Sequence, residues 1–216
     1  YNIGVLFVDE AQSGLTHDYF SQVLDSFKRA VEAKGYDITF LNKGGAGGLS
    51  RMSYLEHCHY RGFDGVMIAC VNFYDAQVLE LVRSDIPMVT VDHLFDNRIN
   101  ITSDNVGGME QLVRYIYGKG HRRIAYIHGA DSSVTQARLT SFYRTAEMLG
   151  LKLPSEYVRE SPYRDTNMAG QVTGELLDLK KPPTCILYPD DFSCFGGITA
   201  IKSRGLRIPE DISIAG

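Results

Sequence analysis

RGFDGVMIAC (residues 61–70) and IPMVTVDH (86–93) are two short stretches with apolar runs, and residues 75–83 between them are expected to form a helix. The runs are apolar at consecutive positions instead of alternate ones. This pattern is typical of strands in a parallel sheet that helices cover on both faces. Residues 61–93 therefore predict one β–α–β unit of a doubly wound α/β fold.

The same alternation of strand and helix extends in both directions along the chain. Further strands are expected at the apolar runs 3–8, 38–41, 124–127, 185–188 and 212–215. Further helices are expected around 20–31, 109–116, 139–149, 168–178 and 192–204, where apolar residues recur at helical spacing. Glycines at 35, 120, 150 and 205 follow four of these helical segments, as expected for residues that end a helix in the left-handed conformation.

The alternation is interrupted once, by the long and polar segment DHLFDNRINITS (92–103). This segment follows four β–α units, and a second series starts at Asn105. We interpret it as a crossover between two lobes, residues 1–102 and 103–216. The predicted fold is therefore α/β, with two doubly wound parallel-sheet lobes.

Composition limits the classes of function. Lys and Arg number 22 against 26 Asp and Glu, a net charge of −4, whereas a nucleic-acid-binding face needs clustered basic residues. The densest basic cluster, His121-Arg122-Arg123, is expected to be a solvated turn. No apolar run approaches the about 20 residues of a membrane helix. The four cysteines show no paired spacing, which fits a reducing cytoplasm.

Three motifs that suggest chemistry have simpler interpretations. The glycine-rich run 44–48 (GGAGG) lacks the Lys-Ser or Lys-Thr of a phosphate loop, so a surface loop is expected. His57-Cys58-His59 are consecutive, and consecutive helical residues do not share the face that a metal site needs. The chain has no GxSxG nucleophile motif. The sequence therefore predicts no enzyme, no metal site and no cofactor.

The candidate ligand-binding residues follow the predicted strands, because ligands of open α/β sheets bind beyond the carboxyl ends of the strands. The segments at these ends are 9–17, Asp92 with His93, 128–138, Tyr163 and 189–191, and Tyr19 stands near the start of the first helix. Carboxylates, an arginine and aromatic rings together suit a small polar ring such as a sugar or a nucleobase.

Structural roles compete with ligand binding for the charged candidates. Asp191 is expected to cap the helix that begins at Phe192, which leaves Asp190 without a structural duty and favours a ligand contact. Arg138 is expected to open a helix, where a cation is mildly unfavourable, and this favours a binding role.

The aromatic candidates have structural alternatives as well. Tyr163 would otherwise pack on the surface, and His93 would otherwise be a simple turn residue. Tyr19 lies beside the apolar stripe of the first helix and is a ligand candidate, whereas Phe20 lies on the stripe and is expected in the core.

Three stretches in order carry a family resemblance: IGVLFVDE (3–10), SDNVGGMEQLVRYIYGKGHRRIAYIHG (103–129) and PDDFSCFGGITAIKSRGLRIPEDISIAG (189–216). The chain resembles the effector-binding domain of the lactose-repressor/galactose-repressor family of bacterial transcription regulators, over nearly its whole length. The resemblance implies the type I periplasmic-binding-protein-like fold, with a ligand cleft between the lobes. It also implies a homodimer, and a DNA-binding helix-turn-helix before Tyr1 and further chain after Gly216 that this sequence does not contain.

Residue by residue, the resemblance assigns the effector contacts to Tyr19, Asp92, His93, Arg138, Tyr163 and Asp190. Asp190 stands where asparagine is common in the family, so the chemistry of the effector is expected to differ. The 13 tyrosines and 10 phenylalanines, with acids near the expected cleft, favour a sugar-like effector.

Two classes of function remain open from the sequence. The first is a cytoplasmic, ligand-responsive transcription regulator. The second is an exported solute-binding protein of a transport system, which has the same two-lobe fold. The cysteines and the GHRRI and RIPEDISIAG stretches favour the regulator, and fold alone does not decide function.

Overall fold

The structure, a computed structural model, describes residues 1–8, 18–41 and 52–216. The chain divides into two compact units, Tyr1–Ser103 and Asp104–Gly216, which we call the N-terminal and C-terminal units. The candidate segment 9–17 and the glycine-rich run 44–48 lie outside the described residues.

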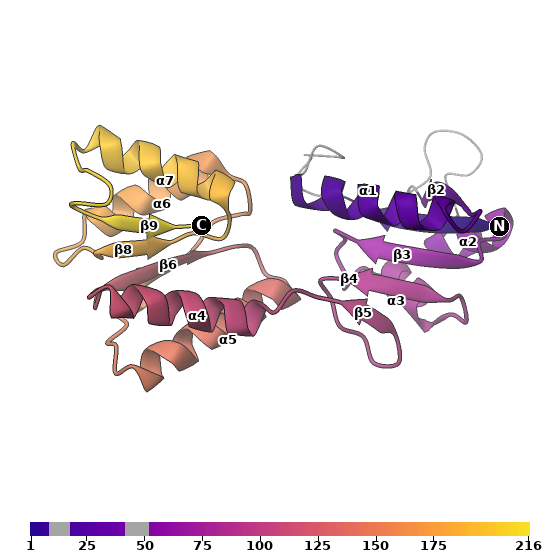
Figure 1. The fold of residues 1–216 in the computed structure, drawn as a ribbon, viewed down its shortest axis with the longest axis horizontal. Helices are drawn as coiled ribbons and strands as arrows, with labels where there is room; N and C mark the ends of the chain where they lie inside the picture. Colours follow the sequence, from indigo (N-terminus) through magenta and orange to yellow (C-terminus); the bar gives the residue numbers. More distant parts are fainter. Residues whose placement is uncertain (9–17, 42–51) are drawn as a thin grey trace. The chain divides into compact units, whose positions relative to one another are not determined.

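The N-terminal unit is a parallel sheet with helices on both faces. Its elements are β1 (Asn2–Phe7), α1 (Asp18–Glu32), β2 (Asp37–Leu41), α2 (Tyr54–Arg61), β3 (Gly65–Ala69), α3 (Ala76–Arg83), β4 (Met88–Val91) and β5 (Ile99–Ile101). The strand order is β2-β1-β3-β4-β5, and every neighbouring pair is parallel. Figure 1 shows these elements along the chain.

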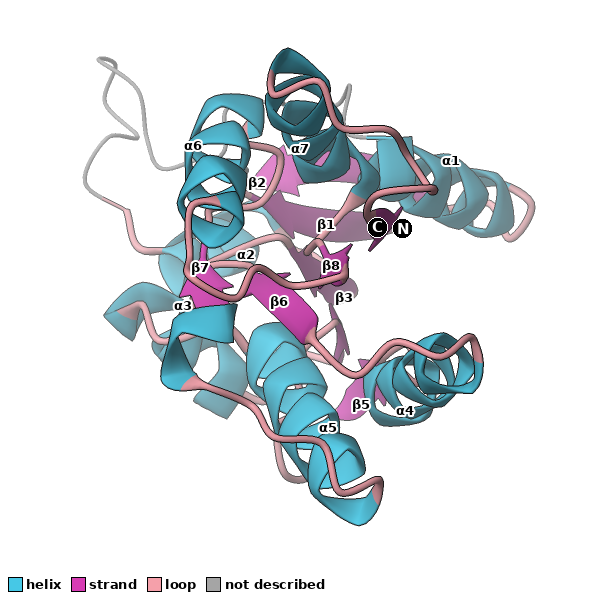
Figure 2. Cartoon of the chain, turned by 90° about the vertical axis from the view of Figure 1, so that its left-hand side faces the viewer, coloured by secondary structure: helices cyan, strands magenta, loops and turns pink. Residues whose placement is uncertain are grey.

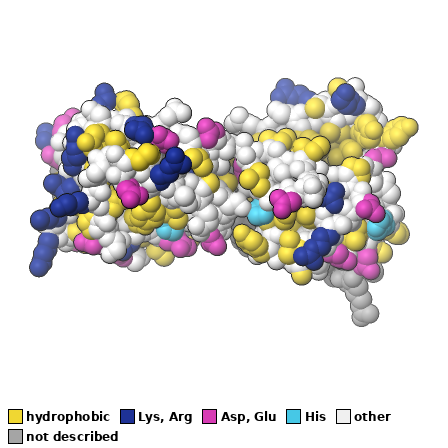
Figure 3. Space-filling view, turned by 90° about the horizontal axis from the view of Figure 1, so that it is seen from below, with side chains coloured by type: hydrophobic (Ala, Val, Ile, Leu, Met, Phe, Trp, Pro, Cys, Tyr) yellow, Lys and Arg dark blue, Asp and Glu magenta, His cyan; other side chains and the backbone are white. Residues whose placement is uncertain are grey.

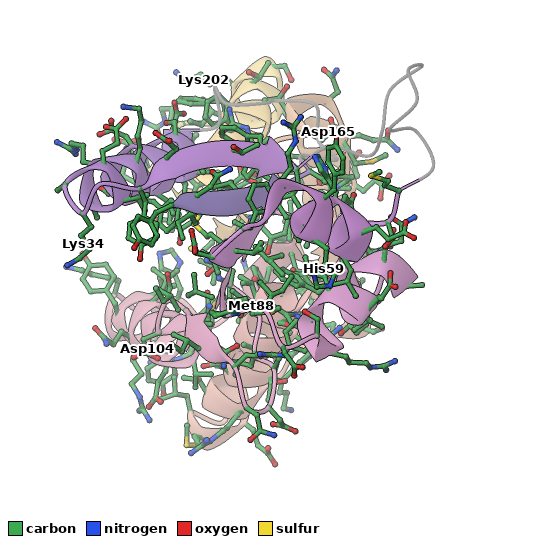
Figure 4. The ribbon with its side chains drawn as sticks, turned by 90° about the vertical axis from the view of Figure 1, so that its right-hand side faces the viewer. Lys34, His59, Met88, Asp104, Asp165 and Lys202 are labelled. Carbon is green, nitrogen blue, oxygen red and sulfur yellow. The ribbon has the colours of Figure 1, made fainter. Side chains whose placement is uncertain are left out.

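Consecutive apolar residues in these strands serve two different cores. In β3, Val66 and Ile68 pack in the core under α2 and α3, while Met67 and Ala69 pack in the core under α1. Successive strand residues point to opposite faces of a sheet, so a strand that is covered on both faces must be apolar throughout. Met88 of β4 is buried in the same way, whereas His59 of α2 is exposed (both labelled in Figure 4).

The C-terminal unit repeats this design with helices paired on each face. Its elements are α4 (Asn105–Gly118), β6 (Ile124–His128), α5 (Ser133–Met148), the 3₁₀ turn η2 (Ser155–Tyr157), β7 (Val158–Glu160), α6 (Thr166–Leu177), β8 (Cys185–Leu187), α7 (Asp191–Ser203) and β9 (Ser213–Ala215). The strand order is β7-β6-β8-β9, again all parallel.

The two faces of this sheet are buried by different helix pairs, as Figure 2 shows. In β6, Ile124 and Tyr126 pack in the core of α4 and α5, and Ala125 and Ile127 pack in the core of α6 and α7. The prediction of an α/β fold with two parallel sheets is therefore confirmed.

The expected helix ends are also observed. Gly35, Gly120, Gly150 and Gly205 all have positive φ, between 65° and 97°. Residues with a Cβ rarely adopt this left-handed conformation, so glycine is the favoured residue where the chain leaves these helices.

The segment 92–103 contains a strand that the sequence analysis described only as a polar crossover. Ile99–Ile101 forms β5, which pairs with β4. The side chain of Asn100 shapes the preceding loop, because its oxygen accepts from Thr90 Oγ1 (2.8 Å) and from the Phe95 amide (3.0 Å). The strand is evident from its pairing with β4, and its own three residues do not reveal it.

Within the described residues, no helix is long and apolar enough to cross a membrane. The four cysteines are free thiols, and burial raises the pKa of both the Cys58 and the Cys185 thiol to about 12. These buried cysteines therefore behave as small apolar side chains.

Candidate functional site

The switch point of the C-terminal unit lies between β6 and β8. The chain leaves β6 toward α5 on one face of the sheet and leaves β8 toward α7 on the other. Ligands of open α/β sheets bind at such a point, outside the carboxyl ends of the strands. The loops that begin at Gly129 and Pro189 therefore border the candidate site of this unit.

Arg138 reaches this edge from the second turn of α5. Its Nε donates to Asn105 Oδ1 (2.9 Å), and its Nη1 donates to the carbonyl oxygen of Pro189 (3.2 Å). The sequence analysis expected Arg138 to open the helix. This was wrong, because α5 begins at Ser133 with Ser132 as its cap. Both acceptors are neutral, so they orient the half-buried guanidinium without cancelling its charge.

Tyr163 lies beside the start of α5, in the loop that follows β7. Its hydroxyl is 2.8 Å from Thr135 Oγ1, which also donates to the carbonyl of Ala130 (2.7 Å). The ring lies so close to Gly129 that a Cβ there would be 2.1 Å from a ring carbon. Tyr163 is therefore a fixed aromatic surface at the carboxyl end of β6, a position that only glycine at 129 permits.

Tyr126 belongs to the same group of side chains but is fully buried beneath it. Burial raises the pKa of its phenol, the nearby Tyr163 raises this pKa further, and the positive charge of Arg138 acts against both. Tyr126 is therefore neutral at physiological pH. Arg138 and Tyr163 therefore both lie near the buried phenol of Tyr126.

Asp190 is the cap of α7, a role that the sequence analysis gave to Asp191. Its Oδ1 accepts from the Ser193 amide (2.8 Å), and its Oδ2 accepts from Ser193 Oγ (3.0 Å) and from the Arg164 amide (2.9 Å). The helix begins at Asp191, one residue before the expected start. The carboxylate of Asp190 thus ties the loop after β7 to the first turn of α7, in addition to any contact with a ligand.

Arg164 was missed by the sequence analysis. It has a left-handed backbone (φ 62°), and its guanidinium carbon lies 3.7 Å from the centre of the Phe192 ring. Left-handed non-glycine residues cost about 1 kcal/mol or more and cluster at functional sites. Neither feature follows from the sequence, because both depend on the contact between the loop after β7 and α7.

Replacement of Asp190 by alanine is expected to destabilise the C-terminal unit more than replacement of Asp191. Asp190→Ala removes the helix cap and two further hydrogen bonds, for a loss of about 2 kcal/mol. Asp191→Ala removes only a favourable charge from an exposed first-turn position, worth about 0.5 kcal/mol. Urea unfolding of both variants measures the difference, and equal losses would contradict the assignment of Asp190 as the cap.

The carboxyl ends of β3 and β4 in the N-terminal unit also have unusual backbones. Cys70 directly follows β3 with φ 53°, and Asp92 directly follows β4 with φ 63°. The amide of Asp92 donates to the carbonyl of Ile101 (2.9 Å), so the turn is anchored on β5. Strained residues at two neighbouring strand ends mark this edge as the candidate site of the N-terminal unit.

His93 packs within an aromatic cluster at the same edge and is only 8% exposed. Its ring is stacked on Phe73 (centroids 4.3 Å apart, planes within 8°), contacts Phe95 (4.5 Å) and meets the edge of Tyr74 (5.9 Å). His93 is therefore buried among aromatic rings and is not a simple exposed turn residue. Burial lowers the pKa of its imidazole, so the ring is neutral at physiological pH.

The stability of the chain is expected to fall as the pH falls below about 6.5. Burial lowers the folded-state pKa of His93, and also of His57 and His121, below the usual 6.5, so the unfolded chain binds protons first. The stabilisation is fully present above pH 6.5 and is lost as the pH falls through the folded-state pKa. Urea unfolding at pH 7.5, 6.5 and 5.5 measures this slope. His93→Phe should reduce the slope, and an unchanged slope would contradict the role of His93.

Tyr19 lies in the first turn of α1 and is 45% exposed. Its ring meets the edge of the Phe20 ring (5.0 Å), and Phe20 in turn packs against Phe7 of β1 (5.5 Å). Phe20 belongs to the core of α1, as the sequence analysis expected. Tyr19 is the aromatic residue of this turn that faces outward.

The six predicted ligand residues thus form two sets. Arg138, Tyr163 and Asp190 lie together at the carboxyl edge of the C-terminal unit, and Tyr19, Asp92 and His93 belong to the N-terminal unit. Their contact with a ligand stays a prediction. Among the residues that the structure describes, no group of three or more His, Cys, Asp or Glu side chains could hold a metal ion.

Comparison with known proteins identifies the family. The family model for periplasmic binding proteins and the sugar-binding domain of the LacI family matches residues 2–216. The chain belongs to this family. Its resemblance to the effector-binding domain of LacI-family regulators is therefore confirmed.

Curated relatives within the LacI family are repressors. The probable HTH-type transcriptional repressor ExuR of Bacillus subtilis (strain 168) is 25% identical over 215 residues, which are 98% of this chain and 62% of the repressor. The HTH-type transcriptional repressor PurR of Proteus mirabilis (strain HI4320) is 27% identical over 205 residues, which are 92% of this chain and 59% of PurR. The chain thus spans about three fifths of the length of these relatives.

Solved structures of regulatory proteins share the fold. A regulatory protein of the LacI family from Chloroflexus aggregans has 26% identity and a TM-score of 0.85, over 100% of this chain and 77% of that one. The transcriptional regulator CelR in complex with cellobiose has a TM-score of 0.85 at 19% identity, over 100% of this chain and 66% of CelR, and shows the fold alone.

Basic and acidic side chains are interspersed on the face seen in Figure 3.

Proposed function

We propose that the chain is the effector-binding part of a LacI-family transcription regulator. A small polar effector, most similar to a sugar, binds in a cleft between the two units at the carboxyl ends of their strands. The family match over residues 2–216, together with repressors as the curated relatives, carries this proposal. The protein acts in the cytoplasm as a homodimer and contacts DNA through a helix-turn-helix outside this sequence.

The side chains at the strand ends support a sugar-like effector. Arg138 offers a charged donor that neutral acceptors hold in place, and Tyr163 offers a fixed aromatic face. Sugars combine hydroxyl groups, which pair with such donors, and C–H faces, which stack on aromatic rings. The carboxylate of Asp92 at the end of β4 adds an acceptor of the kind that hydroxyl groups need.

Regulation follows from a difference in effector affinity between two arrangements of the units. An effector shifts this equilibrium only as far as it binds one arrangement more tightly. In a dimer, the arrangement sets the separation of the two DNA-binding heads, which must match the spacing of the half-sites. No step of this mechanism needs a catalytic residue, a metal ion or a cofactor, so the protein is a binding protein and not an enzyme.

An exported solute-binding protein is the alternative function, since the family model also covers periplasmic binding proteins. The repressors among the curated relatives favour the regulator. An exported protein would bind its solute as a monomer, whereas the regulator is expected to sediment as a dimer. Analytical ultracentrifugation of the full-length protein separates the two functions.

Thermal unfolding against a panel of monosaccharides, sugar phosphates and nucleobases tests the proposal. The panel includes D-glucose, D-glucose 6-phosphate and adenine. A compound that binds only the native state stabilises it by about 2.7 kcal/mol at a hundredfold excess over Kd. A rise in Tm with one class of compound supports a small-molecule effector, and no rise with any compound contradicts it.

A further inference from the structure

Asn105 stands at the junction of the two units and is the first residue of α4. The C-terminal unit begins one residue earlier, at Asp104, which is labelled in Figure 4. The carboxylate of Asp104 caps α4 by accepting from the Gly107 amide (2.8 Å). Asn105 therefore lies in the capped first turn of α4, two residues after Ser103, the last residue of the N-terminal unit.

The side chain of Asn105 holds the arginine of the candidate site. Its Oδ1 accepts from Arg138 Nε (2.9 Å), and the second restraint on the guanidinium is the Pro189 carbonyl (3.2 Å from Nη1). An arginine has five N–H donors in a rigid fork. Two of them form these bonds, so within the described part of the chain three N–H donors of the fork are left for a ligand.

A second hydrogen bond fastens the start of α4 to α5 independently of Arg138. Ser141, three residues after Arg138 on α5, donates from Oγ to the carbonyl of Val106 (2.7 Å) and is buried. The two bonds connect the same helices, but only the Asn105 bond involves the candidate site. Substitutions at Asn105 and at Ser141 therefore distinguish an effect on the position of Arg138 from an effect on the packing of α4 against α5.

We propose that Asn105 is a positioning residue that orients Arg138 for the effector and links the occupied site to the junction of the two units. The inference rests on the proposed function and goes beyond it, because it names the residue through which the site and the junction influence each other. Effector binding tightens the Arg138–Asn105 bond and so the first turn of α4. Because such coupling is reciprocal, a change that loosens the first turn of α4 also weakens effector binding.

Isothermal titration of the full chain with D-glucose, D-glucose 6-phosphate and adenine tests the effect on affinity. Asn105→Ala is expected to weaken binding of whichever compound binds the wild type by about tenfold, as for loss of one charge-assisted hydrogen bond. Asn105→Asp keeps an acceptor oxygen in the same place and should restore affinity to within about threefold. Ser141→Ala should leave affinity unchanged, and an equal loss in this control would overturn the proposal.

The hydrogen bond itself is tested without any ligand, by NMR of the Arg138 Nε–H group. Its signal is identified by its loss in Arg138→Lys and should exchange slowly with water in the wild type and in Asn105→Asp. Exchange should be at least about tenfold faster in Asn105→Ala, because one hydrogen bond is lost. Equal rates in all three proteins would overturn the proposal. If no panel compound binds but these rates differ as expected, the proposed effector class is wrong and the positioning bond stands.

Discussion

Arg138→Ala is expected to weaken effector binding by about a hundredfold while the chain stays folded. In the proposed complex, the variant would remove two charge-assisted hydrogen bonds to the effector, each worth about 1.5 kcal/mol. Among the described residues, it removes the bonds to Asn105 and Pro189 from a half-buried position. Calorimetric titration with the compound that raises the Tm of the wild type measures the loss.

Arg144→Ala is the matched control for this prediction. Arg144 lies on the same helix as Arg138, carries the same charge and is exposed. Its removal should change affinity by less than about twofold, since exposed charges contribute little. Similar losses in both variants would show that net charge, and not the position of Arg138, governs binding.

Gly196→Ala is expected to destabilise the C-terminal unit by about 3 kcal/mol or more. A Cβ at Gly196 of α7 would lie 1.9 Å from the carbonyl oxygen of Thr166, the first residue of α6. The obstacle is backbone, so no side-chain rotation relieves the clash, and forced overpacking costs about 1–3 kcal/mol or more. Thermal unfolding followed by circular dichroism should show Tm lowered by roughly 10 °C.

Gly108→Ala tests whether this loss comes from helix packing. Gly108 is also a helical glycine, but a Cβ there would meet no atom within 4 Å. Alanine favours helix more than glycine does, so this variant should be as stable as the wild type or about 0.5–1 kcal/mol more stable. Equal stability of the two variants would contradict the close packing of α6 and α7.

The sequence was sufficient to predict the fold because the central strands of both sheets are buried on both faces. The run GVMIA of β3 is apolar at every position, since Val66 and Met67 serve two different cores. Strand β5 was not predicted, because Ile99 and Ile101 are 70% and 60% exposed and the strand is defined by its pairing with β4. An apolar pattern cannot reveal a strand that buries so little.

The candidate site was predictable in outline but not in its supporting contacts. Arg138, Tyr163 and Asp190 follow from the rule that ligands bind beyond strand ends, and the structure places them together. The exact cap of α7 was wrong by one residue, because two adjacent aspartates carry the same signal. The roles of Asn105 and Arg164 depend on contacts of side chains far apart in sequence, although the Asp104-Asn105 pair was visible within the family resemblance.

A crystal structure of the chain with the compound that raises its Tm would locate the effector site directly. We expect the compound to lie at the carboxyl ends of β6 and β8, within hydrogen-bonding distance of the Arg138 guanidinium and against the ring of Tyr163. A compound bound away from these strand ends, with the Arg138 side chain still bonded to Asn105 and Pro189, would show that the proposed site is wrong.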